Sequence, residues 1–262
     1  MANKRPLVLF SGGLDSTYRM WQHTKAGTKV DYLYIQGGQG ETKATVEQAS
    51  VDRIIDWLFR STGEEFVHHS KSYGANSIVR FGNSPSVSWA QAIPWLISAL
   101  EKADPDKHSV VEISYVMGDE ILSQIENFRI AWKAMWSISK QGEFVPLEFP
   151  LVTTSKQKIL KEMPPKLYEL TWVCEKPILN IFDGVNNCVD QGRSGGFMCN
   201  ACETRLTELY RYELRNGKTL AEAHAKEITR VLEKERTDDK RRLMVNGPDE
   251  TSMSKEDLDL AG

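Results

Sequence analysis

The chain has 262 residues, of which 40% are hydrophobic and 26% charged, so it can form a sizeable core and lacks the composition of a disordered chain. Its formal net charge of −3 at pH 7 excludes a globally basic surface and argues against a nucleic acid partner. We find no apolar stretch near the roughly 20 residues of a membrane span and no signal peptide, and we therefore expect a cytoplasmic protein that does not enter a membrane.

The first half of the chain alternates strand-like with helix-like segments. Strands are predicted at residues 7–10, 30–36, 66–67 and 110–117, from runs of β-branched and aromatic residues. Helices are predicted at 15–26, 45–59 and 89–103, where Pro94 should kink the last helix or start it. This alternation predicts an α/β fold with a doubly wound parallel sheet.

The second half begins with a clear amphipathic helix. Its apolar residues follow a three–four spacing typical of core packing, and they are Ile121, Ile125, Phe128, Trp132 and Met135. Further on, residues 204–214 and 220–242 are predicted to form helices, the second of them highly charged, before a polar tail.

A short glycine-containing segment joins the first predicted strand to the first predicted helix. Its residues are Ser11, Gly12, Gly13, Leu14, Asp15 and Ser16. Adjacent glycines allow backbone amides to converge on an anion, and the following helix adds the positive end of its dipole. The two serines can donate hydrogen bonds to phosphate, while Asp15 could hold Mg²⁺ or cap the helix. The pattern matches neither the Walker motif nor the dinucleotide fingerprint, and a simple capped glycine turn is the alternative.

All four cysteines of the chain fall close together in the second half. They are Cys174, Cys188, Cys199 and Cys202, the last two forming a C-x-x-C pair. In a reducing compartment such clustering favours a metal over disulfides, and four thiolates suit a tetrahedral structural Zn²⁺ with no open position. A rubredoxin-like iron site, a redox C-x-x-C pair and buried free thiols are the alternatives.

The glycine segment matches the SGGxDS motif of the PP-loop ATP pyrophosphatases, and together with the four cysteines the chain resembles the 7-cyano-7-deazaguanine synthase family over about residues 7–210. Further elements occur in that family's order, namely Gly38-Gln39, Gly118-Asp119, Lys156 within residues 149–160, and Thr171-Trp172 before Cys174. The chain departs from the family at residues 87–91, where an Arg-Asn pair is absent, and at Gly37, where the family has Tyr. Its cysteine spacings are also longer.

The resemblance implies that ATP adenylates 7-carboxy-7-deazaguanine with release of pyrophosphate. Ammonia then gives the amide, and a second ATP carries the amide to the nitrile. In this scheme Lys156 and Asp119 are catalytic, Gln39 joins the glycine segment in binding ATP, and Mg²⁺ accompanies the nucleotide. The implied layout is a nucleotide-binding domain at 1–165, a helical zinc-binding region at 166–244 and a flexible tail at 245–262.

Several alternatives stay open at this stage. A divergent enzyme could stop at the amide or join the activated acyl group to another amine, including one on a protein partner. The chain could also be a non-catalytic nucleotide-binding subunit, and a homodimer is compatible with either reading. A tRNA-thiolating enzyme is disfavoured by the net charge and by the use of all cysteines as metal ligands. A synthetase of the NAD or GMP type is disfavoured by the cysteine cluster.

Overall fold

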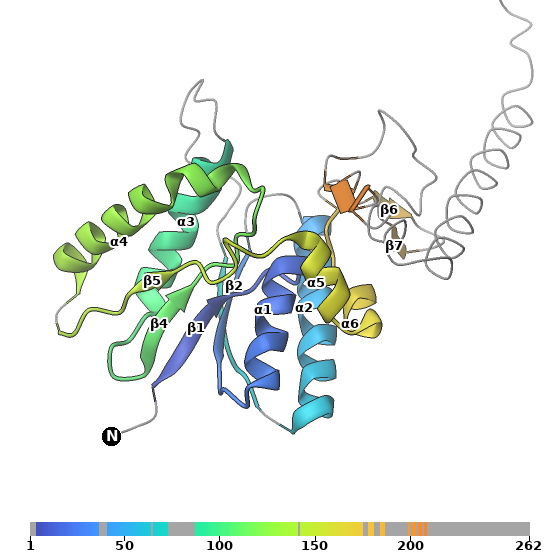
Figure 1. Ribbon diagram of the computed structural model, residues 1–262, viewed down its shortest axis with the longest axis horizontal. Coiled ribbons are helices and arrows are strands. Elements are labelled where there is room, and N and C mark those ends of the chain that lie inside the picture. Colours follow the sequence, from blue (N-terminus) through green and yellow to red (C-terminus); the bar gives the residue numbers. More distant parts are fainter. Residues whose placement is uncertain are drawn as a thin grey trace, which may run out of the picture.

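The computed structural model describes residues 4–36, 41–63, 65–72, 87–140, 142–174, 178–180 and 184–186, together with 199, 201, 202, 204, 205, 207 and 208 (Figure 1). Of the predicted helices at 204–214 and 220–242, all but four residues lie outside these ranges, as does the tail. Among the described helices, none is both long and apolar enough to cross a membrane.

A five-stranded parallel sheet forms the centre of the described structure. Its strands are β1 (Arg5–Leu9), β2 (Asp31–Gln36), β3 (Val67–Ser72), β4 (His108–Glu112) and β5 (Leu147–Glu148). They lie in the order β3-β2-β1-β4-β5, so the chain builds outward on one side of β1 and then on the other. This order confirms the predicted doubly wound sheet, in which the strand order reverses between β1 and β4. Sheets of this kind bind ligands in a crevice beyond the carboxyl ends of the strands at that point, so we expect the crevice beyond β1 and β4.

Helices cover both faces of the sheet (Figure 1). One face carries α1 (Leu14–Lys25), α2 (Glu41–Thr62), α5 (Lys156–Glu162) and α6 (Pro165–Leu170), and the other carries α3 (Val87–Lys102) and α4 (Ile125–Ser139). A 3-10 turn, η2 (Glu120–Gln124), leads into α4. A separate antiparallel pair, β6 (Ile178–Asn180) and β7 (Gly184–Asn186), follows α6.

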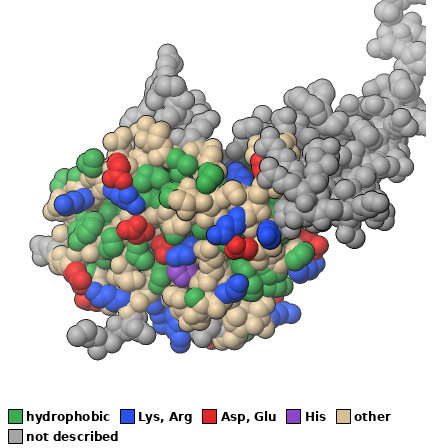
Figure 2. All heavy atoms as spheres, viewed as in Figure 1, with side chains coloured by type: hydrophobic (Ala, Val, Ile, Leu, Met, Phe, Trp, Pro, Cys, Tyr) green, Lys and Arg blue, Asp and Glu red, His purple; other side chains and the backbone are tan. Residues whose placement is uncertain are grey.

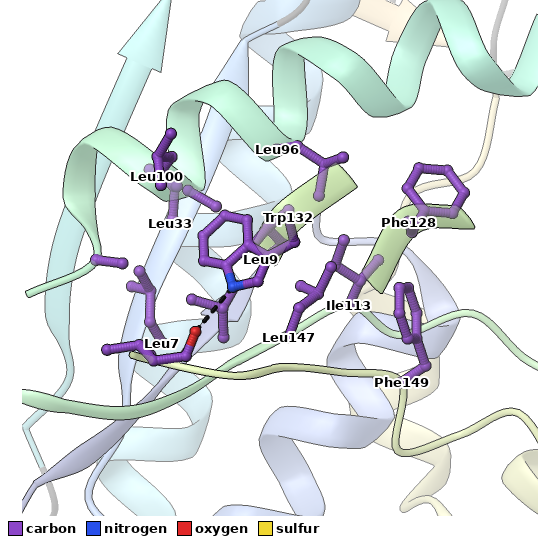
Figure 3. Packing of buried hydrophobic residues seen from close by; sticks show 14 of the residues in the cluster. Leu7, Leu9, Leu33, Leu96, Leu100, Ile113, Phe128, Trp132, Leu147 and Phe149 are labelled. Carbon is purple, nitrogen blue, oxygen red and sulfur yellow. Dashed lines mark hydrogen bonds between the residues drawn. The ribbon is translucent and has the colours of Figure 1, made fainter. Parts of the chain in front are cut away.

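A hydrophobic core lies between the sheet and the helices α3 and α4 (Figure 3). Phe128 and Trp132 of the predicted amphipathic stripe are fully buried there, which confirms that prediction. The indole of Trp132 donates a 2.8 Å hydrogen bond to the carbonyl of Val145, so this buried N–H is satisfied.

Several predicted boundaries differ from those in the structure; α2, for example, is longer at both ends than the predicted 45–59. The third strand, predicted at 66–67, begins at Val67 and runs on to Ser72, so it includes His68 and His69. The fourth strand, predicted at 110–117, begins at His108, opposite Arg5 of β1, and ends at Glu112, opposite Val8. Finally, α3 begins at Val87 and continues through Pro94, whose fixed φ a helix accepts at the cost of one hydrogen bond.

A buried ion cluster joins α1 to β4. The Glu112 carboxylate accepts two 2.7 Å hydrogen bonds from the Arg19 guanidinium and lies 2.8 Å from His23 Nε2. Burial alone would raise the pKa of Glu112, but the bonds from Arg19 and His23 outweigh it and lower that pKa from 4.5 to about 2. Because the folded pKa is depressed, the stabilisation is complete above about pH 4.5 and is lost as the pH falls towards 2.

Replacement of Glu112 by alanine should therefore lower the free energy of unfolding at pH 7 by about 3 kcal/mol, because Arg19 keeps a half-buried charge without its partner. Urea unfolding at pH 7 and at pH 3 measures this. The difference between the wild type and Glu112→Ala should shrink at pH 3. An equal difference at both pH values would contradict the assignment.

Candidate nucleotide loop and cysteine site

The glycine segment lies where the sequence predicts it, between the end of β1 and the start of α1. The Ser11 and Ser16 hydroxyls are 3.3 Å apart, and Ser16 Oγ also donates to the Gly13 carbonyl at 3.3 Å. The Ser11 amide points at Ser16 Oγ at 3.4 Å. These contacts close residues 11–16 into a compact turn after β1. We call this segment the nucleotide loop, after the role that the sequence predicts for it.

Gly12 is required by both conformation and space. Its φ is +73°, in the left-handed region that favours glycine. A Cβ added there would lie 3.2 Å from Val51 Cγ2 and 3.3 Å from the Val51 amide nitrogen, so α2 packs directly against the loop. A side chain here would require the loop or Val51 to shift by a few tenths of an ångström, in addition to the strain of the positive φ.

Gly12→Ala should cost about 1–3 kcal/mol of stability and weaken ATP binding, since the loop must shift. Gly27→Ala is the matched control. Gly27 has φ +63° and nothing within 4 Å of an added Cβ, so that variant carries the backbone strain without the crowding. Thermal unfolding and calorimetric ATP titration compare the two, and equal losses of ATP affinity would contradict a specific requirement at Gly12.

Lys156 and Asp119, for which the resemblance implies catalytic roles, form a pair whose charges both act on Asp15 of this loop. The turn after β4 is held by Asp119, whose Oδ2 accepts a 2.8 Å hydrogen bond from the Val116 amide. The Met117 amide donates to the Thr154 carbonyl at 3.0 Å, which brings the start of α5 to the same place. Lys156 is the first residue of α5, and its Nζ lies 3.9 Å from Asp119 Oδ1. The fold thus brings the Lys156 ammonium and the Asp119 carboxylate together, although the two residues are 37 positions apart in the sequence.

Asp15 lies in the first turn of α1 and does not cap the helix, because Gly13 occupies the N-cap position. Its Oδ1 atom is buried and has no hydrogen-bond partner among the described residues. Burial raises the pKa of Asp15 to about 7; the charge of Lys156 lowers it and that of Asp119 raises it. An enclosed carboxylate oxygen without a donor is suited to receive a cation, which would restore its charged form.

Three of the four cysteines are brought together and buried: Cys174, Cys199 and Cys202. Their Sγ atoms all lie within 4.8 Å of one another, and those of Cys174 and Cys199 are 3.9 Å apart. A hydrogen bond with Cys174, together with burial, raises the pKa of Cys202, so a cation is needed to hold these groups as thiolates. Cys188 lies outside the described residues.

The sulfur spacing fits a single metal ion. Tetrahedral zinc with Zn–S bonds of about 2.3 Å sets neighbouring sulfurs about 3.8 Å apart, close to the 3.9 Å observed. In an iron–sulfur cubane each cysteine binds a different iron, which needs thiolates farther apart than this. The donor set therefore favours one tetrahedral ion, zinc or iron, over a multinuclear cluster.

A second group of metal-capable residues lies at the opposite end of the sheet. Asp31, His69 and His108 have ligand atoms within 4.8 Å of one another. However, His108 Nδ1 accepts a 2.9 Å hydrogen bond from the Asp104 amide, so Nε2 carries the proton and donates to Asp31 at 3.2 Å. Burial lowers the pKa of His108, in keeping with this neutral tautomer. Because Nε2 is not free to bind a metal, we interpret the group as a buried hydrogen-bonded cluster.

The remaining predicted site residue, Gln39, lies outside the described residues. His23 and His108 are each paired with a carboxylate on a strand distant in the sequence, Glu112 and Asp31 respectively. Sequence reasoning missed Arg205, which forms a cation–π contact with Tyr168, 4.4 Å from the ring centroid. Nothing in the local sequence distinguishes that arginine from a surface charge.

On the face drawn in Figure 2, basic and acidic side chains are intermixed rather than separated by sign.

Comparison with known proteins gives structural matches alone. No family model and no curated protein matches the chain. The U34-tRNA thiolase NcsA from Methanococcus maripaludis, with its [4Fe-4S] cluster, is 14% identical, with a TM-score of 0.43 over 89% of this chain and 74% of that one. NMN synthetase from Francisella tularensis is 13% identical, with a TM-score of 0.42 over 89% and 87%. NH3-dependent NAD synthetase from Campylobacter jejuni is 15% identical, with a TM-score of 0.36 over 88% and 86%. At these values we draw no functional conclusion from the matches.

Proposed function

We propose that this chain is an enzyme that cleaves ATP between its α and β phosphates and uses the AMP group to activate a carboxylate. The observation that carries the proposal is the Lys156–Asp119 pair, 3.9 Å apart, whose two charges both act on Asp15 of the nucleotide loop. A phosphate-binding loop beside one cation and two carboxylates supplies what pyrophosphate departure requires. The loop supplies amide donors for the anion, the cation stabilises its charge, and the carboxylates can bind a metal ion.

The substrate we propose is 7-carboxy-7-deazaguanine, on the strength of the motif resemblance. Its carboxylate oxygen attacks the α phosphorus of ATP, and pyrophosphate leaves. Ammonia then attacks the acyl carbon and displaces AMP, giving the amide. For the nitrile, the amide oxygen attacks a second ATP, and loss of AMP with the amide protons leaves the C≡N bond.

Each residue has a distinct part in this proposal. The amides of the nucleotide loop hold the phosphates, and Gln39 contributes to the same pocket. The Lys156 ammonium stabilises the negative charge that builds on the leaving pyrophosphate. Asp15 and Asp119 would hold Mg²⁺, which, when bound, neutralises phosphate charge. Cys174, Cys188, Cys199 and Cys202 would hold a structural Zn²⁺ in the region after residue 165.

Mass spectrometry of the protein incubated with ATP, Mg²⁺ and 7-carboxy-7-deazaguanine tests the proposal, with ammonia present or withheld. Nitrile formed only with ammonia supports the complete reaction. The amide alone, or an adduct on a protein amine when ammonia is withheld, would instead indicate the conjugating alternative. Absence of AMP with this acid would overturn the proposed substrate.

A further inference from the structure

The segment between α6 and the first cysteine runs along the nucleotide loop. The Trp172 amide donates a 3.0 Å hydrogen bond to the carbonyl of Gly12. The carbonyl of the same residue lies against Gly13, 3.7 Å from where a Cβ would be. Two residues earlier, the Leu170 carbonyl accepts a 2.6 Å hydrogen bond from Ser50 on α2. Both glycines of the loop are therefore in contact with the backbone of Trp172.

The side chain of Trp172 reaches the cysteine site. Its indole Nε1 donates a 2.9 Å hydrogen bond to the carbonyl of Cys174, and the ring packs, partly buried, against the cysteine cluster. One residue thus bonds the nucleotide loop through its backbone and a metal-binding cysteine through its side chain.

Two further contacts tie the C-terminal cysteines to the same place. Arg205, three residues after Cys202, donates to the Thr171 carbonyl at 3.0 Å and to the Tyr168 hydroxyl at 2.8 Å. Gln157, next to Lys156 on α5, donates to the Glu208 carbonyl at 2.9 Å. The residues that follow Cys202 therefore make hydrogen bonds in two places. They contact the backbone just before Trp172, and they contact the first turn of α5 beside Lys156.

We infer that Trp172 is a positioning residue that couples the cysteine site to the nucleotide loop, so that a metal bound by the cysteines strengthens nucleotide binding. The inference rests on the proposed function, because it takes residues 11–16 as the nucleotide site. A metal bound by the thiolates would restrict the motion of the Cys174 backbone. The hydrogen bond from the Trp172 indole to the Cys174 carbonyl would then restrict Trp172, whose amide bonds the Gly12 carbonyl. Without the metal, nucleotide must order this segment itself and so binds more weakly.

Because coupling between two ligands is reciprocal, it can be measured as a change in metal affinity. If the metal raises nucleotide affinity by some factor, nucleotide must raise metal affinity by the same factor, typically five-fold or more. The experiment starts from zinc-loaded protein and measures the partition of Zn²⁺ against a competing chelator, with and without α,β-methylene-ATP and Mg²⁺. Calorimetry on the same zinc-loaded samples records nucleotide binding separately.

The informative variant is Trp172→Phe, which keeps an aromatic ring and the backbone amide but loses the indole N–H. Trp136→Phe is the matched control, because the buried Trp136 Nε1 has no hydrogen-bond partner among the described residues. Nucleotide should raise the zinc affinity of the wild type and of Trp136→Phe by about five-fold or more, and that of Trp172→Phe by less than two-fold.

Two results would overturn the inference while leaving the proposed function intact. Nucleotide could bind in the calorimeter without changing zinc affinity in the wild type, or it could protect zinc equally in Trp172→Phe. If zinc-loaded wild type binds no nucleotide at all, the proposed function fails and the coupling fails with it. Arg205→Lys, which loses the forked donor but keeps the charge, serves as a second variant, and it too should reduce the effect of nucleotide on zinc affinity.

Discussion

Lys156→Ala should reduce the formation of AMP and pyrophosphate by about 10²–10³-fold, the effect expected when a charge that stabilises a developing anion is removed. The ammonium lies 3.9 Å from Asp119 at the crevice, with Asp15 within its electrostatic reach. The substitution does not touch the cysteines, so zinc content should be unchanged. Asp15→Ala should give a loss of similar size, again with full zinc content. Steady-state pyrophosphate release and metal analysis measure both effects.

Lys158→Ala is the matched control for that prediction. Lys158 lies on the same helix and forms an ion pair of the same length, 3.9 Å, with Glu162, but both side chains of that pair are about half exposed. Its removal should leave turnover within two-fold of the wild type, since exposed pairs contribute little. Equal losses in Lys156→Ala and Lys158→Ala would show that α5 needs positive charge in general, and would remove the specific role of Lys156.

Cys199→Ser should abolish stoichiometric metal binding and leave most of the protein insoluble. Cys199 is buried with its Sγ 3.9 Å from that of Cys174, and a serine hydroxyl cannot replace a thiolate in a tetrahedral zinc site. The free energy of metal binding at such a site also stabilises the folded form of the segment around it, so losing the metal destabilises that segment. Metal analysis of the soluble fraction and its yield measure the effect.

The neighbouring substitution Ala201→Ser controls for the added hydroxyl, since it changes a partly buried residue beside the cluster without removing a thiol. It should keep one metal per chain. Soluble, fully active Cys199→Ser with less than one equivalent of metal would contradict a structural role for the ion.

The fold could be predicted from the sequence because its signals are local. Apolar runs such as residues 7–10, and the spacing of Phe128 and Trp132, depend on neighbours within a few residues, and the structure confirms both. The nucleotide loop was predictable for the same reason, since strand, glycines and helix follow each other directly. The meeting of Lys156 and Asp119 needs one further step, that the carboxyl ends of parallel strands share one edge of the sheet.

The contacts that organise the site could not be predicted, because they join residues far apart in the sequence. The Trp172 amide bonds Gly12, 160 positions earlier, and no periodicity or composition signals such a pair. The pairing of His108 with Asp31, 77 positions earlier on another strand, carries no local signal either. The strand predicted at 110–117 was shifted because β4 pairs with β1 from His108 onward, and the sequence of one strand does not show where its partner lies. The helix α3 runs through Pro94, so it does not start there, which was one of the two predicted alternatives.

The most direct test of the account is the fate of ATP labelled in its α and γ phosphates, with 7-carboxy-7-deazaguanine, ammonia and Mg²⁺. Cleavage between the α and β phosphates predicts that the α label appears in AMP and the γ label in pyrophosphate, in equal amounts and dependent on the acid. The Lys156→Ala variant should form both products at least a hundred-fold more slowly than Lys158→Ala does. Appearance of the α label in ADP with the γ label in inorganic phosphate would contradict the account.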